Sequence, residues 1–220
     1  MPSHPKNEGL KRKNMNQTNP FGRIISANSR ECVAGYRTSE KELPQFASIV
    51  RIPVQDESSY QIYGLVTDVQ MEQDDFLRQI AAADSIADEV LVDNRYNRNI
   101  PIVIRIVFLG YRTENGFSHL LPPRPPLTLD SIFLCTSSEI ADFTSHGNFG
   151  YLRHILRITN VPVSELLAVH IRQTAIAQRA NNHPVWIKNA IMEIIELMKD
   201  DSSGLLEILS ALGDADISIE

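Results

Sequence analysis

The spacing of apolar residues divides the chain into two regions. Between residues 21 and 135, short apolar runs rich in β-branched and aromatic residues alternate with Gly, Pro, Asp and Ser. This pattern is typical of β-strands separated by turns. It predicts strands at 21–26, 32–36, 48–54, 60–66, 100–111 and 129–135. Beyond residue 137 the apolar positions recur with the spacing of helices that bury one face.

The segment 100–111 is the strongest of the predicted strands. It is apolar on both faces apart from Arg105. Strands buried on both faces occur inside closed or covered sheets, so this segment predicts such a sheet. The run 121–126, Leu-Pro-Pro-Arg-Pro-Pro, cannot pair as a central strand and is expected to form a rigid extended link.

A helix is expected inside the β region and four more after it. Over 74–91, apolar residues recur near helical spacing, and later stripes cover 149–159, 162–177, 184–198 and 202–212. The predicted fold class is therefore α+β: a small N-terminal β-barrel with an inserted helix, followed by a C-terminal helical domain. The predicted boundaries are a flexible basic arm at 1–20, a barrel domain at 21–146 with its insertion near 74–91, and a helical domain at 147–220 with an acidic end.

Composition is that of an ordinary globular protein. Of 220 residues, 43% are hydrophobic and 22% are charged. No stretch approaches the roughly 18 consecutive apolar residues of a membrane helix, and the first residues lack the apolar core of a secretory signal. The chain has two cysteines, Cys32 and Cys135, far apart in sequence. We therefore expect a cytoplasmic protein in a reducing compartment, without a membrane partner.

Charge is distributed unevenly along the chain. The net charge of −6 argues against a protein that coats nucleic acid with its whole surface. Residues 1–20 hold four basic residues against one acid, and residues 147–190 hold five against one. Residues 193–220 hold eight acids against Lys199. This arrangement suits a phosphate backbone or self-association of opposite charges, while solvated helix faces are the plainer interpretation.

Motifs that bind nucleotides or carry catalysis are missing from the sequence. It contains no P-loop, no dinucleotide-binding glycine motif, no nucleophile elbow and no Cys-x-x-Cys pair. Its six histidines do not form a close metal-ligand pair. We therefore predict no catalytic residue, no cofactor and no metal. Arg179 and His183, near a helix end, support a weaker alternative, a nuclease built on the helical domain.

Two sets of residues are candidates for contacts with other molecules. The third C-terminal helix is apolar over a wide arc, and the fourth also has more apolar residues than one buried face needs, which favours an interface. For Trp186 itself, packing within the core is the plainer interpretation. The interface candidates are Trp186, Ile191, Ile195, Leu206 and Leu209. The candidate nucleic-acid contacts are Lys11, Arg12, Lys13, Arg153, Arg157, Arg172 and Arg179.

The order of strand signals from 21 to about 143 resembles the HAS-barrel, the N-terminal β-barrel of HerA-type DNA translocases, which is related to the N-terminal barrel of ATP-synthase subunits. The matching segments are 21–25 (Phe-Gly-Arg-Ile-Ile), 47–52 (Ala-Ser-Ile-Val-Arg-Ile), the Gly-centred 62–69, the long 102–110 and the proline-rich 122–127. The resemblance covers about half of the chain. It implies a barrel that forms a collar and contacts neighbouring subunits or partners, with no catalytic residue of its own.

The chain departs from this family after the barrel. In the translocases a P-loop ATPase core follows, whereas here helices without a Walker motif follow. The leading hypothesis is therefore a non-catalytic assembly or adaptor protein, which docks on a P-loop ATPase of the HerA type or on a nuclease, or forms its own oligomer. The alternative is a nucleic-acid-binding module that uses the basic arm and the basic helices.

Overall fold

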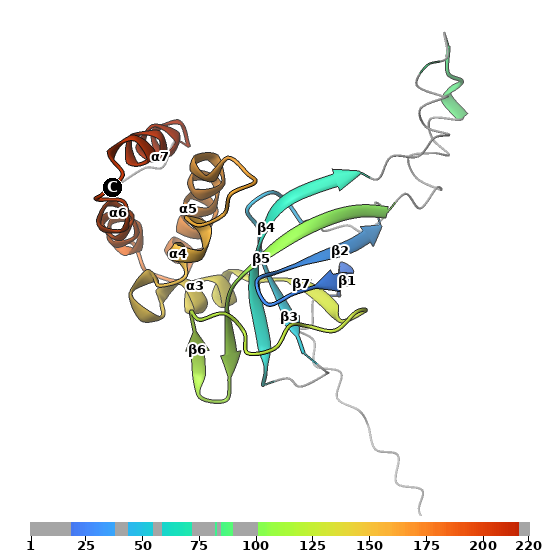
Figure 1. Ribbon diagram of the computed structural model, residues 1–220, viewed down its shortest axis with the longest axis horizontal. Helices are drawn as coiled ribbons and strands as arrows, with labels where there is room; N and C mark the ends of the chain where they lie inside the picture. Colours follow the sequence, from blue (N-terminus) through green and yellow to red (C-terminus); the bar gives the residue numbers. More distant parts are fainter. Residues whose placement is uncertain are drawn as a thin grey trace, which may run out of the picture.

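Six strands of the computed structural model close into an antiparallel barrel at the N-terminal end of the chain (Figure 1). The structure describes residues 19–37, 44–54, 59–71, 82, 85–89 and 101–215. The strands are β1 (Gly22–Ala27), β2 (Glu31–Arg37), β3 (Ile49–Pro53), β4 (Gln61–Met71), β5 (Pro101–Thr113), β6 (Gly116–Ser118) and β7 (Ser131–Leu134). The order β2-β1-β7-β3-β4-β5 is closed by pairing of β2 with β5, and β6 extends β5 as a hairpin.

The barrel interior is filled by alternate residues of its strands. On β5 the inward residues are Ile102, Ile104, Ile106 and Phe108, which pack with isoleucines and valines of the other strands. Gly64 of β4 lies beside Ile106, and an added Cβ at Gly64 would overlap that side chain. The absence of a side chain at this position therefore allows β4 and β5 to approach closely, next to a bulge in their pairing.

The prediction that 100–111 is buried on both faces holds for only part of β5. Val103 and Val107 are half-buried and Arg105 is exposed, whereas 108–110 are buried. The reason is that the helices cover the outer wall of the barrel at Leu109, which joins the core beneath them. The earlier part of the strand has the barrel interior on one face and solvent on the other.

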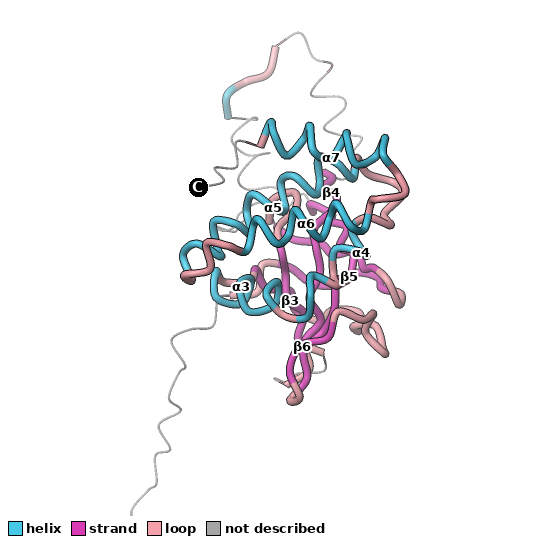
Figure 2. The backbone as a smooth tube through the Cα atoms, turned by 90° about the vertical axis from the view of Figure 1, so that its left-hand side faces the viewer, coloured by secondary structure: helices cyan, strands magenta, loops and turns pink. Residues whose placement is uncertain are grey.

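Helices cover one side of the barrel (Figure 2). They are α3 (Ser137–Ser145), the short 3-10 turn η2 (Gly147–Phe149), α4 (Leu152–Ile155), α5 (Val163–Ala180), α6 (Trp186–Leu197) and α7 (Ser202–Asp214). The first helix thus begins at Ser137, before residue 147, where the sequence places the start of the helical domain. The N-terminal barrel followed by helices confirms the predicted α+β class.

The helix predicted over 149–159 is not continuous. The structure has instead the turn η2 and the single-turn helix α4. The physical reason is that Gly147, Asn148 and Phe149 have positive φ values of 50°, 41° and 55°, which a right-handed helix cannot include.

The barrel and the helices share one core. Ala47, Ile49, Tyr63, Leu65 and Leu109 from the outer wall of the barrel pack with residues of every helix from α3 to α7. The helices therefore pack mainly against one another around α5, and this core, which is separate from the barrel interior, extends onto the outer wall of the barrel. Most of the predicted arm at 1–20 and most of the helix predicted over 74–91 lie outside the described residues.

Candidate functional site

An ion pair fastens the first helix to the barrel. Arg51 of β3 has its Nε 2.8 Å from Oε1 of Glu139 in α3, and the Arg51 guanidinium lies over the Phe133 ring. The other carboxylate oxygen of Glu139 accepts a hydrogen bond from the backbone N–H of Thr136, whose hydroxyl accepts one from the Glu139 N–H. This capping box starts α3 where the ion pair holds it.

We expect Glu139→Ala to destabilise the protein by about 1–3 kcal/mol. The substitution removes half of the capping box and leaves the largely buried Arg51 guanidinium without its carboxylate. Urea denaturation measures the effect, with the exposed Glu114→Ala as the matched control. Equal unfolding midpoints for the two variants would show that the ion pair does not hold the barrel and α3 together.

Buried histidines and aromatic rings line the junction between barrel and helices. Tyr63 of β4 stacks on Phe143 of α3 with ring centroids 4.7 Å apart. His119 donates from Nε2 to the Phe143 carbonyl oxygen at 3.0 Å, and fully buried His170 is hydrogen-bonded to the Tyr151 hydroxyl at 3.1 Å. Burial lowers the pKa of His119 to about 4 and that of His170 to about 3. Both are therefore neutral packing groups at pH 7.

The two cysteines lie in equally unreactive surroundings. Burial raises the pKa of the Cys32 thiol and that of the Cys135 thiol, so both are protonated at neutral pH. Within the part of the chain that the structure describes, no group of three or more His, Cys, Asp or Glu side chains is placed to hold a metal ion.

The candidate nucleic-acid contacts have different surroundings. The guanidinium of Arg153 is half-buried and donates to the His119 carbonyl oxygen, so part of its hydrogen-bonding capacity is used within the junction. Arg157 is exposed after α4, and Arg172 and Arg179 are exposed two turns apart on α5. The remaining candidates, Lys11, Arg12 and Lys13, lie outside the described residues.

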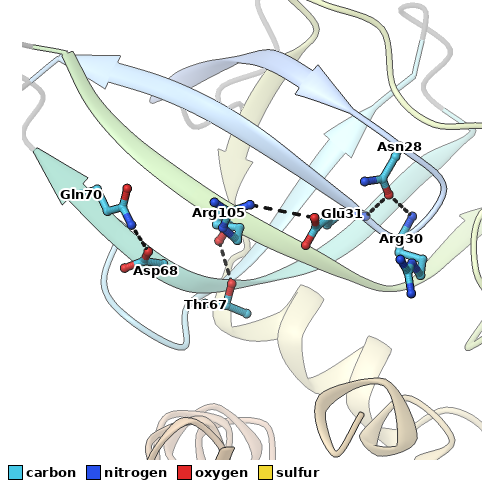
Figure 3. A network of polar contacts seen from close by, with 7 residues as sticks. All are labelled: Asn28, Arg30, Glu31, Thr67, Asp68, Gln70 and Arg105. Carbon is cyan, nitrogen blue, oxygen red and sulfur yellow. Dashed lines mark hydrogen bonds and ion pairs between the residues drawn. The ribbon is translucent and has the colours of Figure 1, made fainter. Parts of the chain in front are cut away.

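Strands β2, β4 and β5 carry a set of polar contacts on the barrel (Figure 3). Arg105 of β5 lies 3.9 Å from the Glu31 carboxylate of β2, and the Thr67 hydroxyl of β4 donates to the Arg105 carbonyl oxygen at 3.3 Å. The Asn28 side chain accepts from the backbone N–H groups of Arg30 and Glu31, which shapes the turn between β1 and β2.

Of the interface candidates, Trp186 belongs to the core. It is 5% exposed, its ring packs 5.7 Å from the Phe149 ring, and its Nε1 donates to the Thr144 carbonyl oxygen at 3.2 Å. The interface prediction is therefore not supported for Trp186. Ile191 is half-buried and packs against the core.

The other three candidates are exposed, Ile195 on α6 and Leu206 and Leu209 on α7, and both helices pack against α5. Leu206 is 68% exposed, Leu209 38% and Ile195 36%. Met192 of α6, which is not among the residues predicted from the sequence, is 60% exposed. We call Met192, Ile195, Leu206 and Leu209 the outer helix face.

No protein-family model matches the chain, and a search of curated proteins returned no significant match. The closed barrel agrees with the fold that the HAS-barrel resemblance implies. Small closed barrels occur in many unrelated proteins, so the barrel by itself does not identify that family. Among the described helices, none combines the length and the apolar character needed to cross a membrane.

The outer helix face could be found only in part from the sequence. Met192 lies on the side of α6 opposite the buried Ile187, Ala190 and Ile194. A helical projection of the sequence places Met192 on the solvent side of α6, among polar residues. An apolar residue at such a position could have indicated a contact with a partner. A helical projection could not distinguish Ile191 from Ile195, because both lie at the edge of the buried side of α6. The packing of the neighbouring elements decides which of the two is covered.

Proposed function

We propose that this protein is a non-catalytic assembly protein in which the barrel has the collar role of a HAS-barrel and the outer helix face binds a second copy of the chain. The carrying observation is Leu206, the most exposed large apolar residue of the described helices, beside the exposed Leu209. Exposed apolar clusters on otherwise packed helices mark protein contacts. The histidines at the junction are buried and neutral, which supports a packing role for them.

Opposite charges beside the outer helix face favour a second copy as its occupant. Lys188 of α6 is exposed one helical turn before Met192, and Glu207 of α7 is exposed next to Leu206. A two-fold contact repeats each interaction twice, so Lys188 of one copy and Glu207 of the other can pair on both sides of the axis. Such pairs set orientation and suppress wrong pairings more than they add affinity.

Burial of the four apolar side chains supplies the association energy. A two-fold contact covers eight such side chains, four from each copy, and each contributes only part of the value for full burial, about 1.5–3 kcal/mol, because they are 36–68% exposed in the single chain. Association itself costs an estimated 4–15 kcal/mol. The two terms are of similar size, so we expect an oligomer that depends on protein concentration and on salt.

Changing Leu206 and Leu209 to Glu together is expected to reduce the oligomer to a single chain, because two charges would be buried in the contact. Light scattering measures the mass over a range of protein concentrations. The matched control is Asn115→Glu with Thr128→Glu, which adds the same charge to exposed polar positions in loops of the barrel, away from α6 and α7. Circular dichroism of both variants verifies that the fold is retained.

Docking on a P-loop ATPase is the other form of the same assembly role. To test this docking, the chain is mixed with a HerA-type ATPase and co-elution is followed. The same two double variants are compared with the wild type. Two results together would rule out the assembly function. The wild-type chain would have the mass of one copy at every concentration, and it would not co-elute with the ATPase.

A further inference from the structure

A pocket of about 420 Å³ lies between the turn after α3 and the connection from α5 to α6. Asn148 and Phe149 of the turn η2 form one side, and Asn182 and His183 of the connection form another. Trp186 of α6 also lines the pocket, as does Asn189 of the same helix. The pocket is separate from the four residues of the outer helix face.

The backbone around this pocket is strained on two sides. Asn148 and Phe149 follow Gly147 in three consecutive left-handed residues, with φ values of 50°, 41° and 55°, and Asn182 across the pocket has φ 64°. A left-handed conformation costs about 1–2 kcal/mol for a residue such as Phe149, whereas Gly and Asn adopt it more readily. Such strain persists where the surrounding structure enforces it, and it concentrates at ligand-binding sites.

The pocket combines aromatic rings with unused hydrogen-bonding groups. The Phe149 and Trp186 ring centroids are 5.7 Å apart, and the hydrogen bond from Trp186 to Thr144 fixes the indole in place. The side chains of Asn148, His183 and Asn189 are exposed and make no hydrogen bond with any described residue. By contrast, the neighbouring Ser145 hydroxyl accepts a hydrogen bond from Gln178 at 2.9 Å.

The lining favours an uncharged ligand. None of the lining residues that the structure describes is Asp, Glu, Lys or Arg. Each carboxamide of Asn offers both a donor and an acceptor, the combination that pairs with the edge of a nucleobase, and Asn pairs with adenine in this way. Aromatic side chains contribute about 1–3 kcal/mol by stacking on a base.

We propose that this pocket binds a nucleobase, with adenine preferred, stacked against Phe149, which itself packs on the buried Trp186, and hydrogen-bonded along its edge by the asparagine carboxamides. The same chemistry recognises a free nucleoside and an unpaired base of a single strand, so the test uses both. This inference does not depend on the outer helix face, and the Leu206→Glu, Leu209→Glu variant should bind as the wild type does.

Trp186 provides a built-in reporter, since it is the only tryptophan of the chain. Adenosine, uridine and a short single-stranded oligoadenylate are titrated separately into the full chain, with excitation outside the nucleoside absorption. We expect saturable quenching of the Trp186 fluorescence by adenosine at lower concentration than by uridine. Because the lining is uncharged, the affinity for adenosine should not change with salt, unlike phosphate binding.

Asn148→Gly and Asn182→Gly are the decisive variants. Glycine accepts the left-handed backbone at both positions, so each variant removes a carboxamide while the fold is retained, which the thermal midpoint verifies. We expect each to weaken adenosine binding at least tenfold. The control is Asn160→Gly, an exposed asparagine outside the pocket lining, which should bind as the wild type does.

Each outcome decides the proposal. A site for a free nucleoside is supported if adenosine quenches the fluorescence, both pocket variants weaken this quenching and the control variant leaves it unchanged. Quenching by the oligonucleotide alone, with the same dependence on the variants, assigns the base to a single strand. No quenching by any probe up to millimolar concentration, or quenching that is equal in all three variants, overturns the proposal.

Discussion

Replacing Ile104 by Asp is expected to unfold the protein. Ile104 is fully buried in the barrel interior, and it lies opposite Ala34 of β2 and Val69 of β4. The substitution removes a buried apolar side chain and introduces a carboxylate with no buried partner. We expect a loss of more than about 4 kcal/mol, which is comparable with the whole stability of a small domain.

The matched control is Ile25→Asp on the neighbouring part of the barrel. The Ile25 side chain is 51% exposed, so the same chemical change leaves the new carboxylate in water. We expect a loss of less than about 1 kcal/mol for this variant. Circular dichroism and thermal unfolding of both variants measure the difference, and a cooperative transition of Ile104→Asp near that of the wild type would show that the barrel interior is not closed.

Acid is expected to destabilise the protein between about pH 6.5 and pH 4. The pKa of His119 is lowered to about 4 and that of His170 to about 3, in both cases mainly because burial disfavours the charged imidazole. In this window the unfolded chain binds protons at the two histidines and the folded chain does not. The free energy of unfolding therefore falls as pH falls, by about 1.4 kcal/mol per pH unit for each histidine.

The sign of the effect follows from the lowered pKa values. Above about pH 6.5, where an ordinary histidine is neutral, folded and unfolded states carry the same charge at these positions, so the penalty is absent. For His119 it is complete near pH 4, where the folded protein also takes up the proton, and for His170 near pH 3. At pH 4.5 the two residues together remove on the order of 5 kcal/mol.

Variants assign this acid sensitivity to the two residues. His119→Gln and His170→Gln keep a polar side chain that does not titrate, and each should reduce the slope by about one proton. Asn160→Gln, which introduces the same side chain at an exposed position without removing a histidine, should leave the slope unchanged. The measurement is urea denaturation at a series of pH values from 8 to 4.5. A wild-type free energy of unfolding that stays constant between pH 7 and pH 5 would contradict neutral burial of both histidines.

Local pattern was sufficient to predict most of the described elements. Strand positions follow from alternation and turn residues, which act between near neighbours in the chain, as at Ile102, Ile104 and Ile106 of β5. The helices α5 and α6 begin close after Pro162 and Pro184, because proline suits a helix start and blocks a helix interior. These features need no knowledge of the rest of the fold.

The candidate sites could be predicted only in part. Leu206 and Leu209 were found because an apolar stripe exceeded what one buried face of α7 requires. Arg153 was selected for its charge, but its guanidinium donates to a carbonyl oxygen that is distant in sequence. The pocket beside Trp186 was missed entirely, because its two sides come from separate segments and the sequence carries no motif that joins them.

The sequence by itself determined most of the strands and the longer helices α5, α6 and α7, since these depend on interactions within a few residues. Only the tertiary structure decided that β2 pairs with β5 to close the barrel, because alternation does not specify a partner strand. It also decided that Trp186 is covered while Leu206 is not, since α6 and α7 each have apolar residues around most of their circumference. The left-handed turn at Gly147–Phe149 is the clearest case, because its backbone is unfavourable in isolation and is held only by the packing around it.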